Sequence, residues 1–369
     1  MKVALDSLLR LIIVAGAILT LVAIGLGHNH HSNEVREPGR SDYICLSGFL
    51  WSENANSPRI LDPRDQAMHL LPLAEGDWLD LASVSPWVNQ EGEAQIVGRW
   101  MQRSGRDSDI VSQEFGLARY SYPSGRLIDQ VPSTMLPVTP VCWYPGTEAR
   151  VLFVAGDGQL YQHQFEPRSA DDLVVGARQP LPIRWGIDPP GDGPVIIHDV
   201  SWPAAPELGQ RLLASISIKR RSGDRWAYSE SAIWWLRLGA DGSTIEAAGP
   251  LHPDDPQEPA IEARRPALGR SPEGQPLLAF ISRDEESKMR TLRLISLEID
   301  PESGDPRIVP GSGRLLAEDC ALVAPVFSKE GTGLSYFFQR PEKTTEIRHL
   351  RLDASRSSTF AWASFPANP

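Results

Sequence analysis

Six stretches of the chain repeat one pattern, and this repetition constrains the fold more than any other feature of the sequence. Each stretch is a short apolar run, a turn, and a second alternating run closed by a turn that contains Asp or Gly. The apolar centres of the second runs are 51 to 65 residues apart, at Leu46, Val97, Leu152, Leu213, Leu278 and Tyr336. Self-similarity at a long period is typical of a propeller or a solenoid. The pattern therefore predicts several similar units in one domain.

The residues within each unit favour β-structure. In the last unit Ile347 and His349 fall on one side of an expected strand, and Leu350 and Leu352 fall on the other, which is the period-2 mark of a half-buried strand. No helical stripe of more than about two turns stands out after residue 28, and 32 Pro and 30 Gly would interrupt one.

These observations predict an all-β chain with a six-bladed β-propeller of four-stranded antiparallel blades over residues 43–365. The first unit is short of an inner strand, because residues 33–42 are too polar to supply one. A two-sheet sandwich or two tandem β domains is the alternative. Six units over this length count against it, since a single sandwich usually has about 100 residues.

Two copies of the repeat carry a family resemblance. The turns at residues 271–274 (Ser-Pro-Glu-Gly) and 328–331 (Ser-Lys-Glu-Gly), the first followed by Leu278-Ala279-Phe280, resemble the WD40-like (PD40-type) repeat of TolB-like propellers. The family's Asp in this turn is Glu here, and its Trp is Arg270 or Phe327. The resemblance implies a propeller and an extracytoplasmic recognition scaffold, and it transfers no catalytic residue.

Residues 1–27 differ in kind from the rest. Lys2 and Arg10 precede an uncharged run over residues 11–27, which is at the lower limit of about 17–25 residues for a spanning helix and longer than a usual cleaved signal core. We expect a signal anchor or transmembrane segment at 1–27 that enters the membrane through residues 8–27, with the propeller outside the cytoplasm, periplasmic or extracellular. A cleaved signal and a buried helix are the alternatives.

Residues 28–42 are polar, and we expect a flexible tether there. His28, His30 and His31 lie in it and are a conceivable weak site for Cu²⁺ or Ni²⁺, but no acid or thiol completes a ligand shell, so no metal site is predicted. The net charge of −11 and a pI near 5.3 argue against nucleic acid as a partner.

The three cysteines are an odd number, and two interpretations remain open. In the simpler interpretation, all three cysteines are buried, reduced thiols that behave as small apolar residues. The other is a Cys45–Cys320 disulfide that would join the first and last blades, which an oxidising compartment permits.

The sequence lacks the usual signatures of catalysis and cofactor binding. It has no Gly-x-Ser-x-Gly, Cys-x-x-Cys, His-Glu-x-x-His, Walker loop or Gly-x-Gly-x-x-Gly, so no cofactor and no catalytic residue is predicted. A pair of carboxylates brought together from different blades remains open, and the scattered candidates are Asp80, Glu114, Asp199 and Glu230.

Two pairs of residues are candidate binding residues. His198 and Asp199 precede Ser201-Trp202, where the chain enters an expected inner strand near the axial mouth, although a satisfied turn histidine is the simpler interpretation. Trp234 and Trp235 are adjacent, so their side chains point to opposite faces, and an exposed one would suit a recognition surface. Packing between blades is the competing interpretation, as it is for the in-phase Trp87, Trp143 and Trp202.

The resulting hypothesis is a membrane-tethered extracytoplasmic scaffold that binds a protein, peptide or glycan at an axial face of the propeller. The alternative is a propeller hydrolase or lyase that acts on extracellular or envelope carbohydrate. Two or more carboxylates with a His or Arg at one mouth of the channel would favour the enzyme. A flat aromatic rim without such a cluster would favour the scaffold.

Overall fold

The protein is described from a computed structural model. The described residues are 43–46, 58–62, 67–74, 77–89, 91–104, 112–144, 149–165, 179–190, 193–202, 208, 211–222, 225–228, 231–251, 262–271, 273–283, 289–327, 333–339, 344–352 and 359–366. The predicted anchor at residues 1–27 and tether at 28–42 lie outside them. Within the described ranges, no helix has the length and apolar character needed to cross a membrane.

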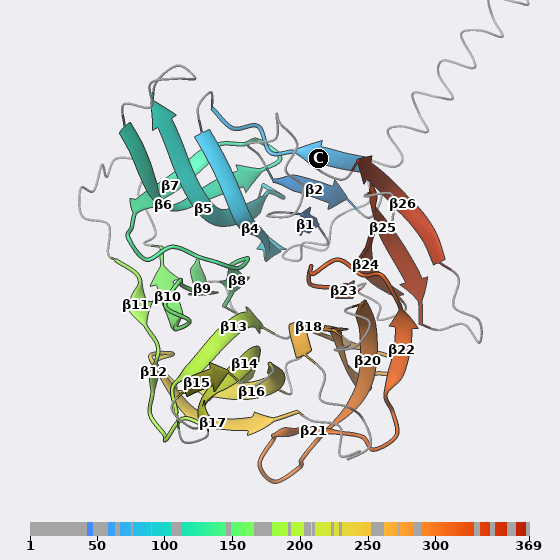
Figure 1. The fold of residues 1–369 in the computed structure, drawn as a ribbon. Helices are drawn as coiled ribbons and strands as arrows, with labels where there is room; N and C mark the ends of the chain where they lie inside the picture. Colours follow the sequence, from blue (N-terminus) through green and yellow to red (C-terminus); the bar gives the residue numbers. More distant parts are fainter. Residues whose placement is uncertain are drawn as a thin grey trace, which may run out of the picture.

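The strands form sheets arranged around a central axis, which confirms the prediction of an all-β propeller (Figure 1). Among the described residues, five sheets have four or more strands, and we call these the blades. The inner strands are β4 (Asp77–Val88), β8 (Cys142–Trp143), β13 (Val195–Ser201), β18 (Glu262–Arg270) and β23 (Val326–Phe327). Each blade proceeds outward from its inner strand mainly by antiparallel pairing (Figure 1).

The strands of the first three blades are, in chain order, β4 (Asp77–Val88), β5 (Ala94–Ser104), β6 (Ser112–Tyr122) and β7 (Leu127–Pro132); β8 (Cys142–Trp143), β9 (Arg150–Val154), β10 (Leu160–Gln164) and β11 (Leu181–Pro182); and β12 (Arg184–Trp185), β13 (Val195–Ser201), β14 (Arg211–Ser222), β15 (Arg225–Tyr228), β16 (Ala232–Leu238) and β17 (Thr244–Pro250). The segment that carries β11 and β12 joins two blades, because β11 pairs with β10 and β12 pairs in parallel with β17.

The last two blades contain β18 (Glu262–Arg270), β19 (Pro276–Arg283), β20 (Arg290–Ile299), β21 (Pro306–Ile308) and β22 (Arg314–Ala317); and β23 (Val326–Phe327), β24 (Gly333–Gln339), β25 (Thr344–Arg351) and β26 (Thr359–Pro366). Both β21 and β22 pair with β20, at different parts of its length.

The first predicted blade is not a complete blade, so the prediction of six four-stranded blades is wrong. Among the described residues, the structure has five blades and a three-stranded sheet of β1 (Ile44–Leu46), β2 (Arg59–Asp62) and β3 (Ala67–Leu70). The expected lack of an inner strand is also wrong, because β1 lies nearest the axis and contacts the inner strand β4 (Figure 1). The physical reason for the shorter sheet is chain length, since only residues 71–76 lie between β3 and β4 and leave no room for an outer strand after β3.

Consecutive sheets pack face to face through apolar clusters. Five buried clusters occur among the described residues, and each contains side chains from two consecutive sheets. In one of them, Leu152 of β9 packs with Ile197 of β13 and Leu212 of β14. Both faces of a blade are therefore buried, which explains why β19 has buried residues at six successive positions.

The in-phase tryptophans pack between blades, as the sequence predicts. Trp87 and Trp143 meet edge to face with ring centroids 5.0 Å apart, and Trp143 Nε1 donates to the Ser83 carbonyl at 3.1 Å. One blade further on, Trp202 packs on Tyr144 at 4.5 Å. Such pairs add to the area burial of large rings.

The three cysteines are free, and their thiols are not paired with one another. Burial raises the pKa of Cys45, Cys142 and Cys320 to about 12 in each case. The structure thus agrees with three reduced thiols and not with a Cys45–Cys320 bond.

The inner strands are irregular where they carry charged residues. The pairing register shifts between Asp80 and Ser83 in β4, between Ile197 and Asp199 in β13, and between Arg264 and Ala267 in β18. Arg265 has a φ of 55°, a conformation that residues other than glycine adopt rarely. Because a bulge re-aims the side chains next to it, these shifts position the charged groups of the inner strands.

The β4 bulge depends on a glycine in the neighbouring strand. A Cβ at Gly98 of β5 would lie 2.6 Å from the Asp80 carbonyl oxygen and 2.8 Å from the Ala82 Cβ. We expect Gly98→Ala to lower the free energy of unfolding by about 2 kcal/mol, because the obstacle is backbone and cannot move without disturbing the bulge. Denaturant unfolding checks this. Gly313→Ala is the control, since nothing lies within 4 Å of its added methyl group; equal stability of the two variants would contradict the expectation.

Candidate functional site

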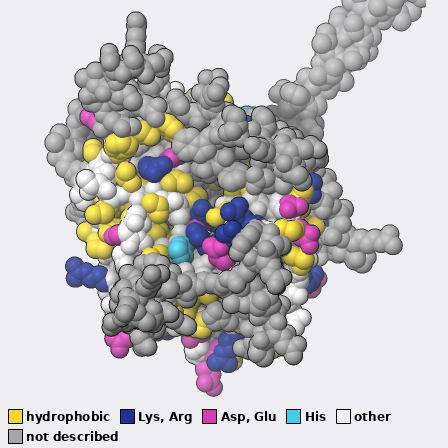
Figure 2. All heavy atoms as spheres, in the orientation of Figure 1, with side chains coloured by type: hydrophobic (Ala, Val, Ile, Leu, Met, Phe, Trp, Pro, Cys, Tyr) yellow, Lys and Arg dark blue, Asp and Glu magenta, His cyan; other side chains and the backbone are white. Residues whose placement is uncertain are grey.

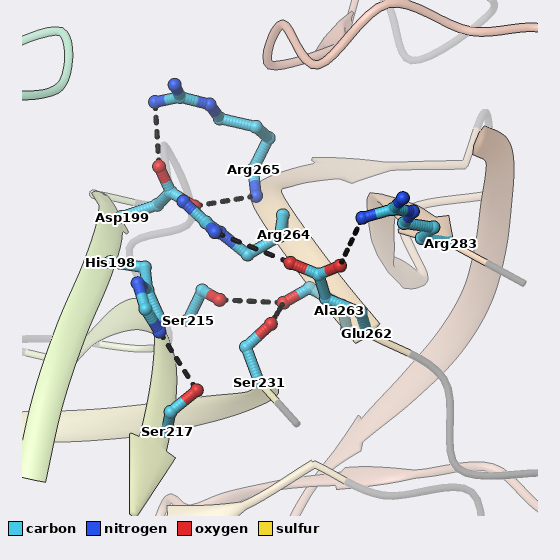
Figure 3. Close-up of polar contacts among 10 residues, drawn as sticks. All are labelled: His198, Asp199, Ser215, Ser217, Ser231, Glu262, Ala263, Arg264, Arg265 and Arg283. Carbon is cyan, nitrogen blue, oxygen red and sulfur yellow. Dashed lines mark hydrogen bonds and ion pairs between the residues drawn. The ribbon is translucent and has the colours of Figure 1, made fainter. Parts of the chain in front are cut away.

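Charged side chains from two neighbouring blades meet beside the axis. Asp199 of β13 faces Glu262, Arg264 and Arg265 of β18, and Arg283 at the end of β19 completes the group (Figure 3). We call these five residues the axial charge cluster. Figure 2 shows a group of Lys and Arg side chains beside acidic and His side chains near the centre of this face.

Asp199 is the buried centre of the cluster. Its side chain is 3% exposed, and Arg264 Nε lies 2.6 Å from its Oδ2. Arg265 Nη1 lies 2.7 Å from its Oδ1, as an ion pair without hydrogen-bond geometry, and the Arg265 backbone N–H donates to Oδ2 at 3.3 Å. A carboxylate so far removed from water needs such partners, because an unpaired buried charge is costly.

Arg264 lies between the two carboxylates of the cluster. Its Nε contacts Asp199, and its Nη1 lies 3.6 Å from Glu262 Oε1. Glu262 is about one-third exposed, and its other oxygen lies 3.9 Å from Arg283 Nη1. Three guanidinium groups and two carboxylates leave the cluster with an excess of positive charge, in a chain whose net charge is −11.

Arg265 is the least satisfied member of the cluster. Its Nε is buried and has no hydrogen-bond partner among the described residues. Burial lowers the pKa of its guanidinium and Arg264 adds to this lowering, whereas Asp199 opposes it. An arginine stays protonated at neutral pH even so, and Arg265 therefore brings an incompletely compensated charge to the site.

His198 points away from the cluster. In Figure 3 its ring is directed toward Ser217, and its Nε2 lies 2.9 Å from Ser217 Oγ. Burial lowers the pKa of His198, Arg264 adds to this lowering, and Asp199 and Glu262 oppose it. The imidazole is therefore neutral at pH 7. The two adjacent residues of the predicted pair thus take separate places, and Asp199 alone joins the cluster.

Hydroxyl groups fix the start of β18 against the preceding blade. Ser215 Oγ donates to the Ala263 carbonyl oxygen at 2.6 Å, and Ser231 Oγ donates to the same oxygen at 3.1 Å. Ala263 lies between Glu262 and Arg264 in the chain, so these bonds hold the backbone that carries the arginines.

The structure does not bring Trp234 and Trp235 to the axial charge cluster. Both lie on β16, and β14 separates this strand from β13. Trp235 is buried, with the Arg211 guanidinium 5.9 Å from its ring centroid, and Trp234 packs against the core shared with the previous blade. Asp80, another scattered carboxylate, pairs with Arg99 of β5 at 2.8 Å.

The sequence analysis missed the arginines and Glu262. A signal was available in the repeat. The charged residues 264 and 265 stand before Ala267-Leu268. His198-Asp199 stands at the corresponding position before Ser201-Trp202. The structure corrects the expected position of His198 and Asp199, which lie in the second half of β13 and not at its entry, whereas residues 262–265 begin β18. The two runs nevertheless meet, because β13 and β18 are neighbouring inner strands.

Comparisons with known proteins do not identify a family. No family model matches the sequence, and no curated protein matches it. The TolB-like resemblance therefore has no support beyond the propeller fold.

Solved structures that match include two putative 6-phosphogluconolactonases and an endo-arabinase. The one from Bacteroides uniformis is 15% identical with a TM-score of 0.40, over 89% of this chain and 84% of its own. The one from Bacteroides fragilis is 10% identical with a TM-score of 0.43, over 91% and 97%. The endo-arabinase from Bacteroides thetaiotaomicron is 11% identical with a TM-score of 0.29, over 90% and 95%. These values assign no activity to this chain.

Removing the charge of Asp199 tests its central place in the cluster. We expect Asp199→Asn to lower the free energy of unfolding at pH 7 by about 3 kcal/mol, because Arg264 and Arg265 would lose their shared buried counter-charge. Glu298→Gln, an exposed carboxylate on β20, is the matched control and should change it by less than about 0.5 kcal/mol. Urea unfolding of both variants measures this, and a similar small loss in each would refute a central role.

A buried histidine outside the cluster predicts acid sensitivity. Burial, with a contribution from Arg119, lowers the pKa of His163 to about 4, against about 6.5 in an unfolded chain. Between these two pKa values, the folded state therefore binds fewer protons than the unfolded state does. The contribution of neutral His163 to the free energy of unfolding is fully present above about pH 6.5, and it is lost as the pH falls toward 4.

We expect His163→Gln to lessen this dependence by about 2 kcal/mol between pH 7 and 4. Unfolding free energies measured across this range for the wild type, the variant and His69→Gln, whose side chain is exposed, check it. A variant that keeps the full wild-type slope would show that the proton uptake occurs elsewhere.

Proposed function

We propose that this protein is a binding scaffold whose axial charge cluster receives a protein, peptide or glycan ligand at one face of the propeller. The observation that carries the proposal is the position of Arg264 between Asp199 and Glu262. The arginine compensates both carboxylates, and the excess positive charge of the cluster remains for a ligand. Because one fold can host many unrelated functions, the residues of the site and not the propeller fold support this function.

The alternative is a carbohydrate-acting enzyme, and the mere presence of two carboxylates with arginines and a nearby histidine would favour it. A glycosidase, however, places its two carboxyl groups on either side of the bond to be cleaved and keeps one of them protonated. Here the guanidinium of Arg264 occupies the space between Asp199 and Glu262. The two carboxyl groups thus contact one guanidinium between them, an arrangement that differs from two carboxyl groups flanking a sugar bond.

The proposal includes a location outside the cytoplasm, with the chain held in a membrane through residues 8–27. Its support is the uncharged run behind Lys2 and Arg10. Partition of the full chain into the carbonate-resistant membrane fraction is the expected result. Recovery of the intact chain in the soluble cytoplasmic fraction would contradict this part of the proposal.

A photo-crosslinking amino acid at the edge of the cluster tests ligand binding by the full chain in its native cells. We expect position Arg283, which is 44% exposed, to give a crosslinked adduct. Position Arg307 of β21, 65% exposed and paired with Asp300, is the matched control and should give none. The absence of an adduct specific to position 283 would contradict the binding proposal.

The same preparation tests the enzymatic alternative. The substrates are a panel of acidic and neutral polysaccharides and sugar lactones. We expect the wild-type protein to turn over none of them faster than the Glu262→Gln variant does. Turnover by the wild type that this variant abolishes would overturn the scaffold function.

A further inference from the structure

We propose that Arg265, together with Arg264, binds a single carboxylate group on an acidic peptide segment of the partner. This inference rests on the proposed binding function and specifies the chemistry of the ligand. Asp199 then acts as an internal competitor, which holds the two guanidinium groups in place when no ligand is bound.

The charge of the cluster sets the charge of the ligand group. Arg264, Arg265 and Arg283 bring three positive charges, and Asp199 and Glu262 bring two negative ones. One carboxylate balances the remainder, whereas a phosphate group of about −2 at pH 7 would exceed it. The burial of the side chains of Asp199, Arg264 and Arg265, each less than one-fifth exposed, strengthens this preference because solvent screens the charges less.

The donors of Arg265 set the geometry of the ligand group. A guanidinium has five N–H donors in a planar fork, and this fork matches the two oxygens of a carboxylate. At the Arg265 side chain, Nη1 contacts Asp199, while Nε is buried without a partner among the residues that the structure describes. A buried donor without an acceptor is costly, and a carboxylate oxygen from a ligand would remove that cost.

The backbone prepares Arg265 for this contact. Its φ of 55° lies at the register shift of β18, and its own N–H donates to Asp199 Oδ2. Ala263, two residues earlier, is fixed by Ser215 and Ser231. A side chain on a backbone held this firmly loses little freedom on binding, which favours affinity.

The surroundings favour an acidic peptide over an acidic glycan. The five residues of the cluster include no aromatic side chain, whereas a glycan site usually offers a flat ring on which the sugar packs. Trp234 and Trp235 do not supply one, because Trp235 is buried and Trp234 packs against the core. Clusters of arginine recognise acidic peptide motifs through charge and paired hydrogen bonds.

The test measures binding of fluorescent peptides to the purified full chain by anisotropy. The probe is a capped peptide of alternating Glu and Gly, and its comparison peptides carry Gln or phosphoserine in place of Glu; an oligogalacturonate of similar length is the glycan arm. We expect the Glu peptide to bind about 10-fold more tightly than the Gln peptide, which corresponds to one charge-assisted contact. This comparison needs no variant and is independent of folding defects.

Two variants at the same ion pair should act in opposite directions. Arg265→Gln should weaken binding of the Glu peptide about 10-fold, because the receiving guanidinium is lost. Asp199→Asn should strengthen it several-fold, measured below its lowered melting temperature, because the internal competitor loses its charge. Arg307→Gln is the matched control and should leave binding unchanged. A purely structural role of the ion pair would weaken binding in both variants alike.

The outcomes separate this inference from the function on which it rests. Equal binding of the Glu and Gln peptides would overturn the carboxylate assignment. Weaker instead of stronger binding of the Glu peptide by Asp199→Asn would overturn it as well. Preferred binding of the phosphoserine peptide or the oligogalacturonate would replace it with another ligand class. If position 283 still gives its crosslinked adduct in these cases, the binding scaffold stands; if it gives none, the function itself fails.

Discussion

The burial of both faces of each blade is the constraint from which the rest of the structure follows. The first four blades present apolar side chains to the sheet before and the sheet after, and the last blade presents them to the blade before it. Five mixed clusters of this kind occur among the described residues. Leu278 and Ala279 of β19, for example, belong to clusters on opposite faces of the same blade. Large rings such as Trp143 then lock neighbouring inner strands together.

Buried charged groups in this packing are paired with opposite charges, and Asp199 has several partners. Asp199 is almost completely buried, and its carboxyl group contacts two guanidinium groups and a backbone N–H. The pair of Arg119 and Asp129, 2.6 Å apart, follows the same rule between β6 and β7. A buried ion pair of this type adds little net stability compared with apolar residues, but removing one partner is costly. Ligand recognition, and not a large net contribution to stability, is therefore the role that we propose for the axial charge cluster.

The order of the groups along the cluster decides which chemistry it suits. Arg264 contacts both Asp199 and Glu262 and so compensates both acids. Arg265 lies at the other side of Asp199 and carries the donor that the described residues leave unsatisfied. A site whose carboxylates are paired with arginines and whose Arg265 is incompletely hydrogen-bonded is suited to binding an anion, and this is the basis of the proposed function.

The sequence by itself determined the class of fold, because the period-2 alternation and the repeat every 51 to 65 residues are properties of local chain geometry. It also determined the inter-blade role of Trp87, Trp143 and Trp202, since their phase in the repeat fixes the strand on which they lie. It overstated the number of four-stranded blades, because the first repeat forms a sheet of three strands and the chain then enters β4 after only six residues.

Only the tertiary structure decided the composition of the site. The chain separates Asp199 from Arg264 and Arg265 by more than sixty residues, and their contact depends on the packing of β13 against β18 and on a bulge in each strand. Local sequence likewise could not show that His198 turns to Ser217 while its neighbour turns to the arginines, or that Trp235 is buried while Trp234 is partly buried against a core cluster. Those outcomes are set by which blade covers each face, and that is a property of the closed arrangement rather than of any one repeat.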